Sequence, residues 1–170
     1  MAKWGSVDYR QFKELQEKIE KFQKEDMDTI CRNIAKNLAA RLLRMVKQRT
    51  PEGQYEVITY TNKDGSTRSY NEGMQGGTLR RNWKIEATIT RKAEGYEIRV
   101  VNPTEYASYV ESGHRQEPGR FVPQIGKSLS NGFAPGRYML RESETKLQAN
   151  ADAIAQARLE KEIRKLFEND

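Results

Sequence analysis

Apolar and polar residues alternate along two neighbouring segments in the middle of the chain. The apolar residues stand at every second position, Trp83, Ile85, Ala87 and Ile89 in the first segment and Tyr96, Ile98 and Val100 in the second. A period of two is typical of strands with one buried face. The connection at 91–95 is short and ends with Gly95, which can adopt a positive φ. The pattern therefore predicts an antiparallel hairpin over 83–101, which Asn102 and Pro103 end.

Other segments carry apolar residues at helical spacing. The most regular segment is 27–49, where apolar residues stand three or four positions apart: Met27, Ile30, Ile34, Leu38, Leu42 and Met45. Asp26 is expected to cap this helix, and Thr50–Pro51 to end it, because the residue before a proline disfavours helical backbone. The same period predicts a C-terminal helix over 137–167 and a first helix that begins after Asp8.

Two insertions separate these elements. Residues 52–76 hold Tyr55, Val57 and Thr59 in alternation, followed by turn residues, which predicts a polar hairpin that projects as an arm or lies against a neighbouring subunit. Residues 114–132 belong to a long loop rich in Gly and Pro without a periodic apolar face. Such a composition predicts an assembly element that is poorly ordered in the free subunit.

Two short elements lie between the insertions. Thr78 is expected to cap a turn before the first central strand, and 105–111 to form a brief helix that ends at Gly113. The large apolar residues of these elements should lie mostly inside, where they would clamp the hairpin to the helices: Leu79, Trp83, Tyr106, Tyr109 and Val110.

The elements together predict one α+β domain over 1–170, in which long N-terminal and C-terminal helices pack an antiparallel sheet. Extended loop or hairpin insertions at about 52–76 and 114–132 complete it. The 170 residues are 36% hydrophobic and 32% charged, with a mean hydropathy of −0.92. A thin core must therefore support a large polar surface, which favours an elongated unit over a compact enzyme.

Candidate catalytic chemistry is sparse. His114 is the only histidine and Cys31 the only cysteine, so the sequence offers no zinc-ligand set and no choice of Cys–His pairs. Cys31 is expected to be a buried thiol near Ile34, and His114 a surface residue. No phosphate-binding motif occurs. We therefore expect no enzyme activity, no cofactor and no metal site, and no apolar run is long enough to predict a membrane span.

The distribution of charge leaves a DNA-binding function open. Thirty Lys and Arg against 24 Asp and Glu give a net charge of +6. The 27–49 helix carries a basic ridge made of Arg32, Lys36, Arg41, Arg44, Lys47 and Arg49. Such a ridge is most often a solvated face, but its cations could also be the phosphate contacts of a basic DNA-binding module.

The order of the motifs resembles a known family. The helix ending in Arg49-Thr50-Pro51 is followed by Gly77-Thr78-Leu79-Arg80-Arg81-Asn82-Trp83, by Tyr106-Ala107-Ser108-Tyr109-Val110-Glu111-Ser112-Gly113, and by Phe133-Ala134-Pro135-Gly136-Arg137-Tyr138-Met139-Leu140. This order is similar to that of the tailed-phage neck proteins, the "gene ten" group of head–tail joining proteins of lambdoid phages and prophages. The residues that carry the resemblance, and which it implies are motif or assembly residues, are Leu79, Arg80, Trp83, Tyr106, Tyr109, Val110, Glu111, Gly113 and Arg137.

The resemblance implies a structural virion component that joins the head to the tail, or completes the tail end, as a homo-oligomeric ring around the DNA channel. The implied partners are further copies of the chain and other neck, head-closure, tail-terminator or tail-tube proteins. The chain would be made in the cytoplasm of the bacterial host and end in the virion, with no membrane partner. DNA would pass the channel without specific binding.

The basic ridge has an expected place in such a ring. Dense arginines along the channel would hold phosphate and slow DNA ejection. Arg41, Arg44 and Lys47 are therefore expected at a subunit interface or on the outer wall. Their expected partners are carboxylates of a neighbour's first helix: Glu14, Glu17 and Glu20.

Overall fold

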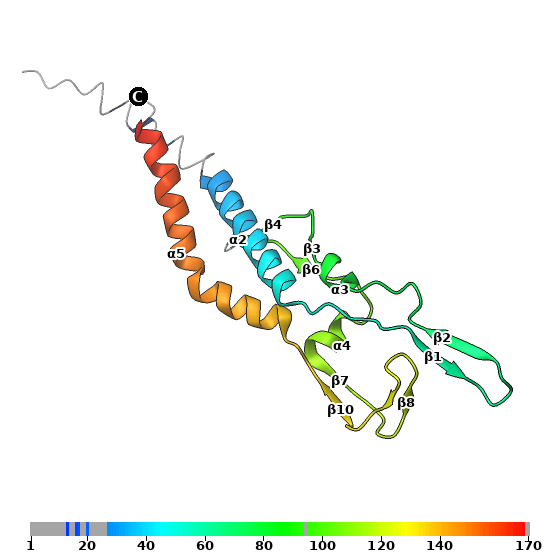
Figure 1. Ribbon diagram of the computed structural model, residues 1–170. Coiled ribbons are helices and arrows are strands. Elements are labelled where there is room, and N and C mark those ends of the chain that lie inside the picture. The colour runs from blue at the N-terminus through cyan, green and yellow to red at the C-terminus, as the bar shows by residue number, and fades with distance from the viewer. Residues whose placement is uncertain (1–12, 14–15, 18–19, 21–26, 94, 169–170) are drawn as a thin grey trace, which may run out of the picture.

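Two long antiparallel helices and a lobe of short elements make up the molecule. The structure is a computed structural model that describes residues 13, 16–17, 20, 27–93 and 95–168. Helices α2 (Met27–Arg49) and α5 (Met139–Glu168) lie side by side and run in opposite directions, and the short elements of the lobe lie beyond the C-terminal end of α2 and along one side of it (Figure 1). The chain combines these helices with small antiparallel sheets, which confirms the α+β prediction.

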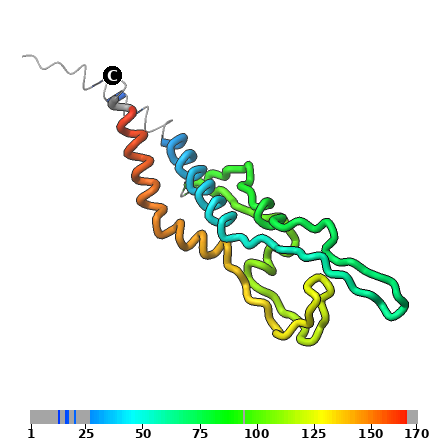
Figure 2. The backbone as a smooth tube through the Cα atoms, viewed as in Figure 1, coloured from blue at the N-terminus to red at the C-terminus, as the bar shows by residue number. Residues whose placement is uncertain are grey.

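The lobe contains two short helices, α3 (Thr78–Arg81) and α4 (Ala107–Ser112), and antiparallel strand pairs. The pairs are β1 (Ile58–Thr61) with β2 (Thr67–Tyr70), β3 (Lys84–Ile85) with β6 (Val100–Val101), β4 (Thr90–Lys92) with β5 (Gly95–Glu97), β7 (Gly113–Arg115) with β10 (Phe133–Pro135), and β8 (Phe121–Val122) with β9 (Lys127–Ser128). Figure 2 shows the course of the backbone through them. Every sheet in the described part of the chain has two strands, so its outer edges are unpaired.

The predicted central hairpin is present, but a bulge divides it. Ile85 pairs with Val100, and Thr90 pairs with Glu97. Between these pairs, four residues of the first strand face two of the second, so the first strand holds two extra residues. Ala87 lies in this bulge and is exposed. The predicted alternation therefore breaks there.

Polar contacts anchor the tip of this hairpin to the start of α2. The Tyr96 hydroxyl donates a hydrogen bond to Asp28, and Arg91 and Arg32 form ion pairs with the same carboxylate at 3.2 and 3.3 Å. The hydrogen bond from Tyr96, helped by the two guanidinium groups, lowers the pKa of Asp28 below its usual value. The hairpin therefore contacts α2 both at its tip and at its base, where β3 and β6 lie against the helix.

A small apolar core joins the helices to the lobe. Its buried members come from four segments: Val46 of α2, Leu79 of α3, Trp83 before β3 and Met139 of α5. Half-buried side chains pack against this cluster: Leu42, Leu43, Val100, Ala107, Val110 and Leu140. The predicted burial of Leu79 and Trp83 is confirmed.

Helix α5 bends along its length, although it contains neither Gly nor Pro (Figure 1). Ser143, Thr145 and Asn150 each donate a side-chain hydrogen bond to the carbonyl oxygen four residues earlier, at 2.6, 3.0 and 3.0 Å. Such bonds compete with the helical ladder and favour bending. They give a local cause for the bend.

Three burial and capping predictions are wrong. Cys31 is exposed, because it follows Ile30 and is turned about 100° away from the buried stripe. Tyr106 and Tyr109 are 43% and 58% exposed, since α4 turns other residues toward the core. The N-cap position of α3 is Gly77, in left-handed backbone and without a side-chain cap, so Thr78 is not the cap.

The two insertions pack against each other, and we call them the arm pair (52–76 and 114–132). The Tyr60 ring meets the Tyr70 and Phe121 rings edge-on, each at 5.8 Å between centroids. Asn71 Nδ2 donates to the carbonyl oxygens of Glu56 at 2.9 Å and of Gln124 at 2.7 Å. The arms are therefore one unit.

The second arm differs from its prediction. The loop was expected to lack regular structure, yet it forms β8 and β9, and strands β7 and β10 close its base. Backbone hydrogen bonds hold this arm together, and its sequence has no periodic apolar residues. The spacing of apolar residues therefore could not predict its strands. In the first arm the strand begins only at Ile58, after Tyr55 and Val57. The predicted cap Asp26 and most of the helix predicted after Asp8 lie outside the described residues.

Trp83 is the most sensitive probe of this core. Trp83→Ala should lower the free energy of unfolding by about 3–5 kcal/mol, as for other buried aromatic residues. Trp83→Phe keeps most of the apolar volume and loses the ring N–H, so we expect a smaller loss of about 1–3 kcal/mol. Urea denaturation followed by circular dichroism measures both. An unchanged midpoint for Trp83→Ala would refute the burial.

Candidate functional site

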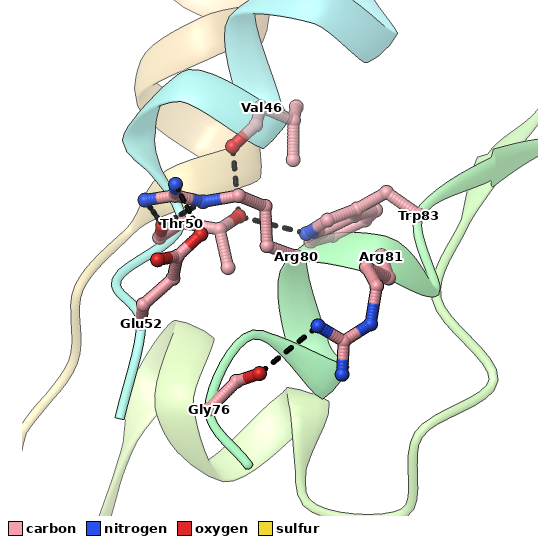
Figure 3. A network of polar contacts seen from close by, with 7 residues as sticks. All are labelled: Val46, Thr50, Glu52, Gly76, Arg80, Arg81 and Trp83. Atoms are coloured by element: carbon pink, nitrogen blue, oxygen red, sulfur yellow. Dashed lines mark hydrogen bonds and ion pairs between the residues drawn. The ribbon is translucent and has the colours of Figure 1, made fainter. Parts of the chain in front are cut away.

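The end of α2 is capped by a side chain from the lobe. The last carbonyl groups of a helix lack partners within the helix, and Pro51 prevents α2 from continuing. Arg80 fills this need: its Nε and Nη2 donate to the Thr50 carbonyl oxygen at 2.9 and 2.7 Å (Figure 3). Its Nη1 donates to Glu52 Oε1 at 2.5 Å. The guanidinium group therefore connects α3 to the C-terminal end of α2.

Thr50 itself lies at the centre of this contact and is fully buried. Its hydroxyl donates to the Val46 carbonyl oxygen at 2.7 Å and accepts a hydrogen bond from Trp83 Nε1 at 2.8 Å (Figure 3). A buried hydroxyl and indole N–H are costly unless paired, and here each satisfies the other. The sequence identified Thr50 only as a helix stop. A hydroxyl residue just before the proline, in line with the apolar stripe, was the available signal.

The start of α5 is capped from the lobe in the same manner. The Glu111 carboxylate accepts hydrogen bonds from the backbone N–H of Leu140 at 3.0 and 3.2 Å and of Arg141 at 3.0 Å. The first N–H groups of a helix lack intrahelical partners and carry a partial positive charge. A carboxylate placed there accepts hydrogen bonds from these N–H groups and balances the partial charge. Glu111, from another helix, therefore acts as the N-terminal cap of α5.

Backbone contacts reinforce this second contact. The N–H of Arg137 donates to the Val110 carbonyl oxygen at 2.8 Å, and the N–H of Tyr138 donates to that of Glu111 at 3.0 Å. Gly113 has φ +83°, and a Cβ there would lie 2.5 Å from the Ala134 carbonyl oxygen. The two backbones approach so closely that this position requires glycine. Gly136 shows the same constraint from the other side.

The structure therefore sorts the predicted motif residues into two joints and a surface. Leu79, Arg80 and Trp83 meet at the end of α2, which we call the first joint. Val110, Glu111, Gly113 and the backbone of Arg137 meet at the start of α5, which we call the second joint. Tyr106 and Tyr109 belong to neither joint and face outward.

The predicted interface charges lie apart from both joints, along α2. Arg41 and Arg44 are exposed and Lys47 is half-buried. Arg44 and Lys47 border a shallow cleft of about 410 Å³ whose floor includes Ala40 and Leu43. Among the described residues, none of the three cations has a carboxylate partner; Arg41 donates instead to the side chain of Asn37.

Metal-binding clusters of His, Cys, Asp and Glu are absent from the part of the chain that the structure describes. None of the described helices is long and apolar enough to cross a membrane. The joints are polar contacts between backbone and side chains of one chain. Their chemistry is that of holding elements in a fixed arrangement.

Comparison with known proteins identifies the chain. The family model described as "Bacteriophage HK97-gp10, putative tail-component" matches residues 13–113, more than half of the chain. The chain belongs to this family. No curated protein and no solved structure matches it significantly. The HK97-gp10-like match includes the first joint and, up to Gly113, the α4 half of the second joint, and it indicates a structural component of the phage virion.

Substitution of Gly113 is expected to cost more than substitution of a glycine that has a positive φ but open space around it. Gly119 has nearly the same φ, +86° against +83°, but a Cβ there would meet nothing within 4 Å. Gly119→Ala should therefore show only the backbone strain, about 1 kcal/mol. Gly113→Ala should cost about 1–3 kcal/mol more, because its methyl group enters the second joint and because φ +83° with ψ 171° is a conformation that only glycine readily adopts. Urea midpoints of the two variants test this, and equal losses would contradict the proposed constraint.

Proposed function

We propose that this chain joins head to tail, or completes the tail end, of a tailed phage or prophage-derived tail, and that it does so as a homo-oligomeric ring around the DNA channel. The HK97-gp10-like family match carries the proposal. Its partners would be copies of itself and other neck, head-closure, tail-terminator or tail-tube proteins. DNA would pass the channel without specific contacts, and the role needs neither cofactor nor catalysis.

A deletion tests the role of the second arm in assembly. Gln116 N–H donates to the Gly132 carbonyl oxygen at 2.9 Å, so the loop closes at its base. Replacing 116–131 with one asparagine would create an Asn–Gly turn between β7 and β10. We expect the helical circular dichroism signal and cooperative unfolding to persist, because the core cluster lies elsewhere. Joined particles should be lost in a prophage that carries only this variant.

Two results would contradict that expectation. Joined particles at the yield of the full chain would show that the arm has no part in assembly. Loss of the helical signal would show that 116–131 belongs to the fold. Electron microscopy of particles and circular dichroism of the purified chain separate these outcomes.

A basic DNA-binding module is the alternative, and the exposed cations of α2 favour it. Its affinity for duplex DNA should fall steeply with salt, because bound cations release counterions from phosphate. The proposed ring subunit should bind DNA weakly at every salt concentration.

A charge reversal tests whether the basic ridge lies at a subunit interface. Arg41→Glu with Arg44→Glu should hinder ring assembly, and adding Glu17→Lys and Glu20→Lys should partly restore it. Glu14, the third predicted partner, lies outside the described residues. Normal sedimentation of the Arg41/Arg44 double variant would leave the ridge as a solvated face.

A further inference from the structure

Asn131 is the only asparagine of the sequence that directly precedes a glycine, and it lies at the base of the second arm, just before β10. Its side chain is exposed and makes no hydrogen bond within the described part of the chain. Most other described asparagines use their carboxamides to hold segments in place: Asn37, Asn62, Asn71, Asn82, Asn102 and Asn150. The carboxamide of Asn131 is therefore open to attack.

The backbone N–H that follows Asn131 is free as well. Gly132 accepts a hydrogen bond from the Gln116 N–H at 2.9 Å, but its own N–H has no acceptor among the described residues. Gly132 also has no side chain to hinder its nitrogen. Asn33 likewise has an unbonded carboxamide, but it lies inside α2, where the next N–H belongs to the helical hydrogen-bond ladder. Asn131 therefore combines an accessible carboxamide with an accessible neighbouring nitrogen.

The Asp64–Gly65 pair between β1 and β2 shows the opposite, protected arrangement. The Gly65 N–H donates to the Asn62 carbonyl oxygen at 3.0 Å. The Asp64 carboxylate accepts hydrogen bonds from the hydroxyl and the backbone N–H of Ser66 at 2.6 and 2.9 Å, and these bonds lower the pKa of Asp64 below its usual value. An ionised carboxylate resists attack by a nitrogen nucleophile. The groups that could react are thus occupied in the first arm and free in the second.

We propose that Asn131 is a site of spontaneous deamidation, which converts it to aspartate and isoaspartate in the folded subunit. The Gly132 nitrogen loses its proton and attacks Asn131 Cγ. A bond forms between these two atoms, the bond from Cγ to Nδ2 breaks, and Nδ2 leaves as ammonia with the proton. Water then opens the cyclic imide: breaking the new bond gives aspartate, and breaking the original peptide bond gives isoaspartate. The reaction consumes water and needs no enzyme and no oxidant.

The place of Asn131 in the fold makes isoaspartate the more disruptive product. Isoaspartate inserts Cβ into the backbone directly before β10, the strand that leads from the second arm toward α5 (Figure 1). Beyond this point the chain is fixed, because Pro135 pairs with Gly113 and the backbones at Gly113 and Gly136 leave no room. The insertion must therefore be accommodated on the side of the arm. We expect the hydrogen bond from Gln116 to Gly132 to open, whereas aspartate adds only a charge.

Peptide mapping of the purified full chain tests the proposed site. Trypsin releases residues 128–137, a peptide in which Asn131 is the only side-chain amide. After incubation in mildly alkaline buffer at physiological temperature, this peptide should gain the mass difference between an OH and an NH2 group. Electron-transfer fragmentation should identify both aspartate and isoaspartate. Asn150, whose side chain donates to the Lys146 carbonyl oxygen, is the internal control and should react at least tenfold more slowly.

Two variants separate the reaction from its effect on the arm. Gly132→Ala is compatible with the fold, because the φ of Gly132 lies outside the left-handed region and a Cβ there would meet only Pro118, at 3.8 Å. Its methyl group crowds the attacking nitrogen, so deamidation should slow at least tenfold. Asn131→Asp supplies the charge without the backbone insertion. Hydrogen–deuterium exchange of the Gln116 N–H should rise in the incubated chain, but neither in incubated Gly132→Ala nor in fresh Asn131→Asp.

The same chain unfolded in urea shows whether the fold leaves the site open. There the local sequence alone sets the rate, and we expect the folded chain to react at a rate within tenfold of it. A folded rate more than tenfold lower, or an undiminished rate in Gly132→Ala, would overturn the proposed site. Deamidation with unchanged exchange of the Gln116 N–H would support the site and overturn its effect on the arm. The reaction takes place within a single chain, so these results are independent of the proposed ring.

Discussion

The unpaired backbone groups at the ends of two long helices are the constraint on which the structure depends. The last carbonyl groups of α2 and the first N–H groups of α5 need partners from outside the helices. Arg80 supplies donors to the first, and Glu111 supplies acceptors to the second. Because both caps come from the lobe, the lobe is attached to the ends of both long helices. The apolar cluster around Trp83 fills the space between the two joints.

Fixing the lobe in this way leaves the arm pair free to serve another purpose. The arms contribute none of the buried core cluster and hold each other through Tyr60 and Asn71. Two-stranded hairpins are marginally stable alone, so mutual packing is what lets them keep a shape. Asn71 has a left-handed φ of 65° and pairs with carbonyl oxygens of both arms, which places the chain turn where the arms meet. A shaped surface that adds little to the core is one that assembly can use.

The sequence predicted the elements whose signal is periodic and missed those that depend on tertiary contacts. The spacing of apolar residues gave α2, α5 and the ends of the central hairpin. The bulge at Ala87 was invisible, because a two-residue insertion changes register without changing composition. Cys31 was predicted to lie in the buried stripe of α2, but it is one position past the buried Ile30 and faces solvent. The role of Glu111 could not be read from its own surroundings, since its partners Leu140 and Arg141 lie in another helix.

The segment around α4 shows how one short helix can present different side chains to the core and to solvent. Ala107, Val110 and Glu111 turn toward the core and the start of α5, whereas Tyr106 and Tyr109 turn to solvent. The spacing of three between Ala107 and Val110, and again between Tyr106 and Tyr109, places each pair on its own face. A change on the inner face would therefore tilt the outer face as well. The capping that stabilises α5 therefore also sets the direction in which the two tyrosines face solvent.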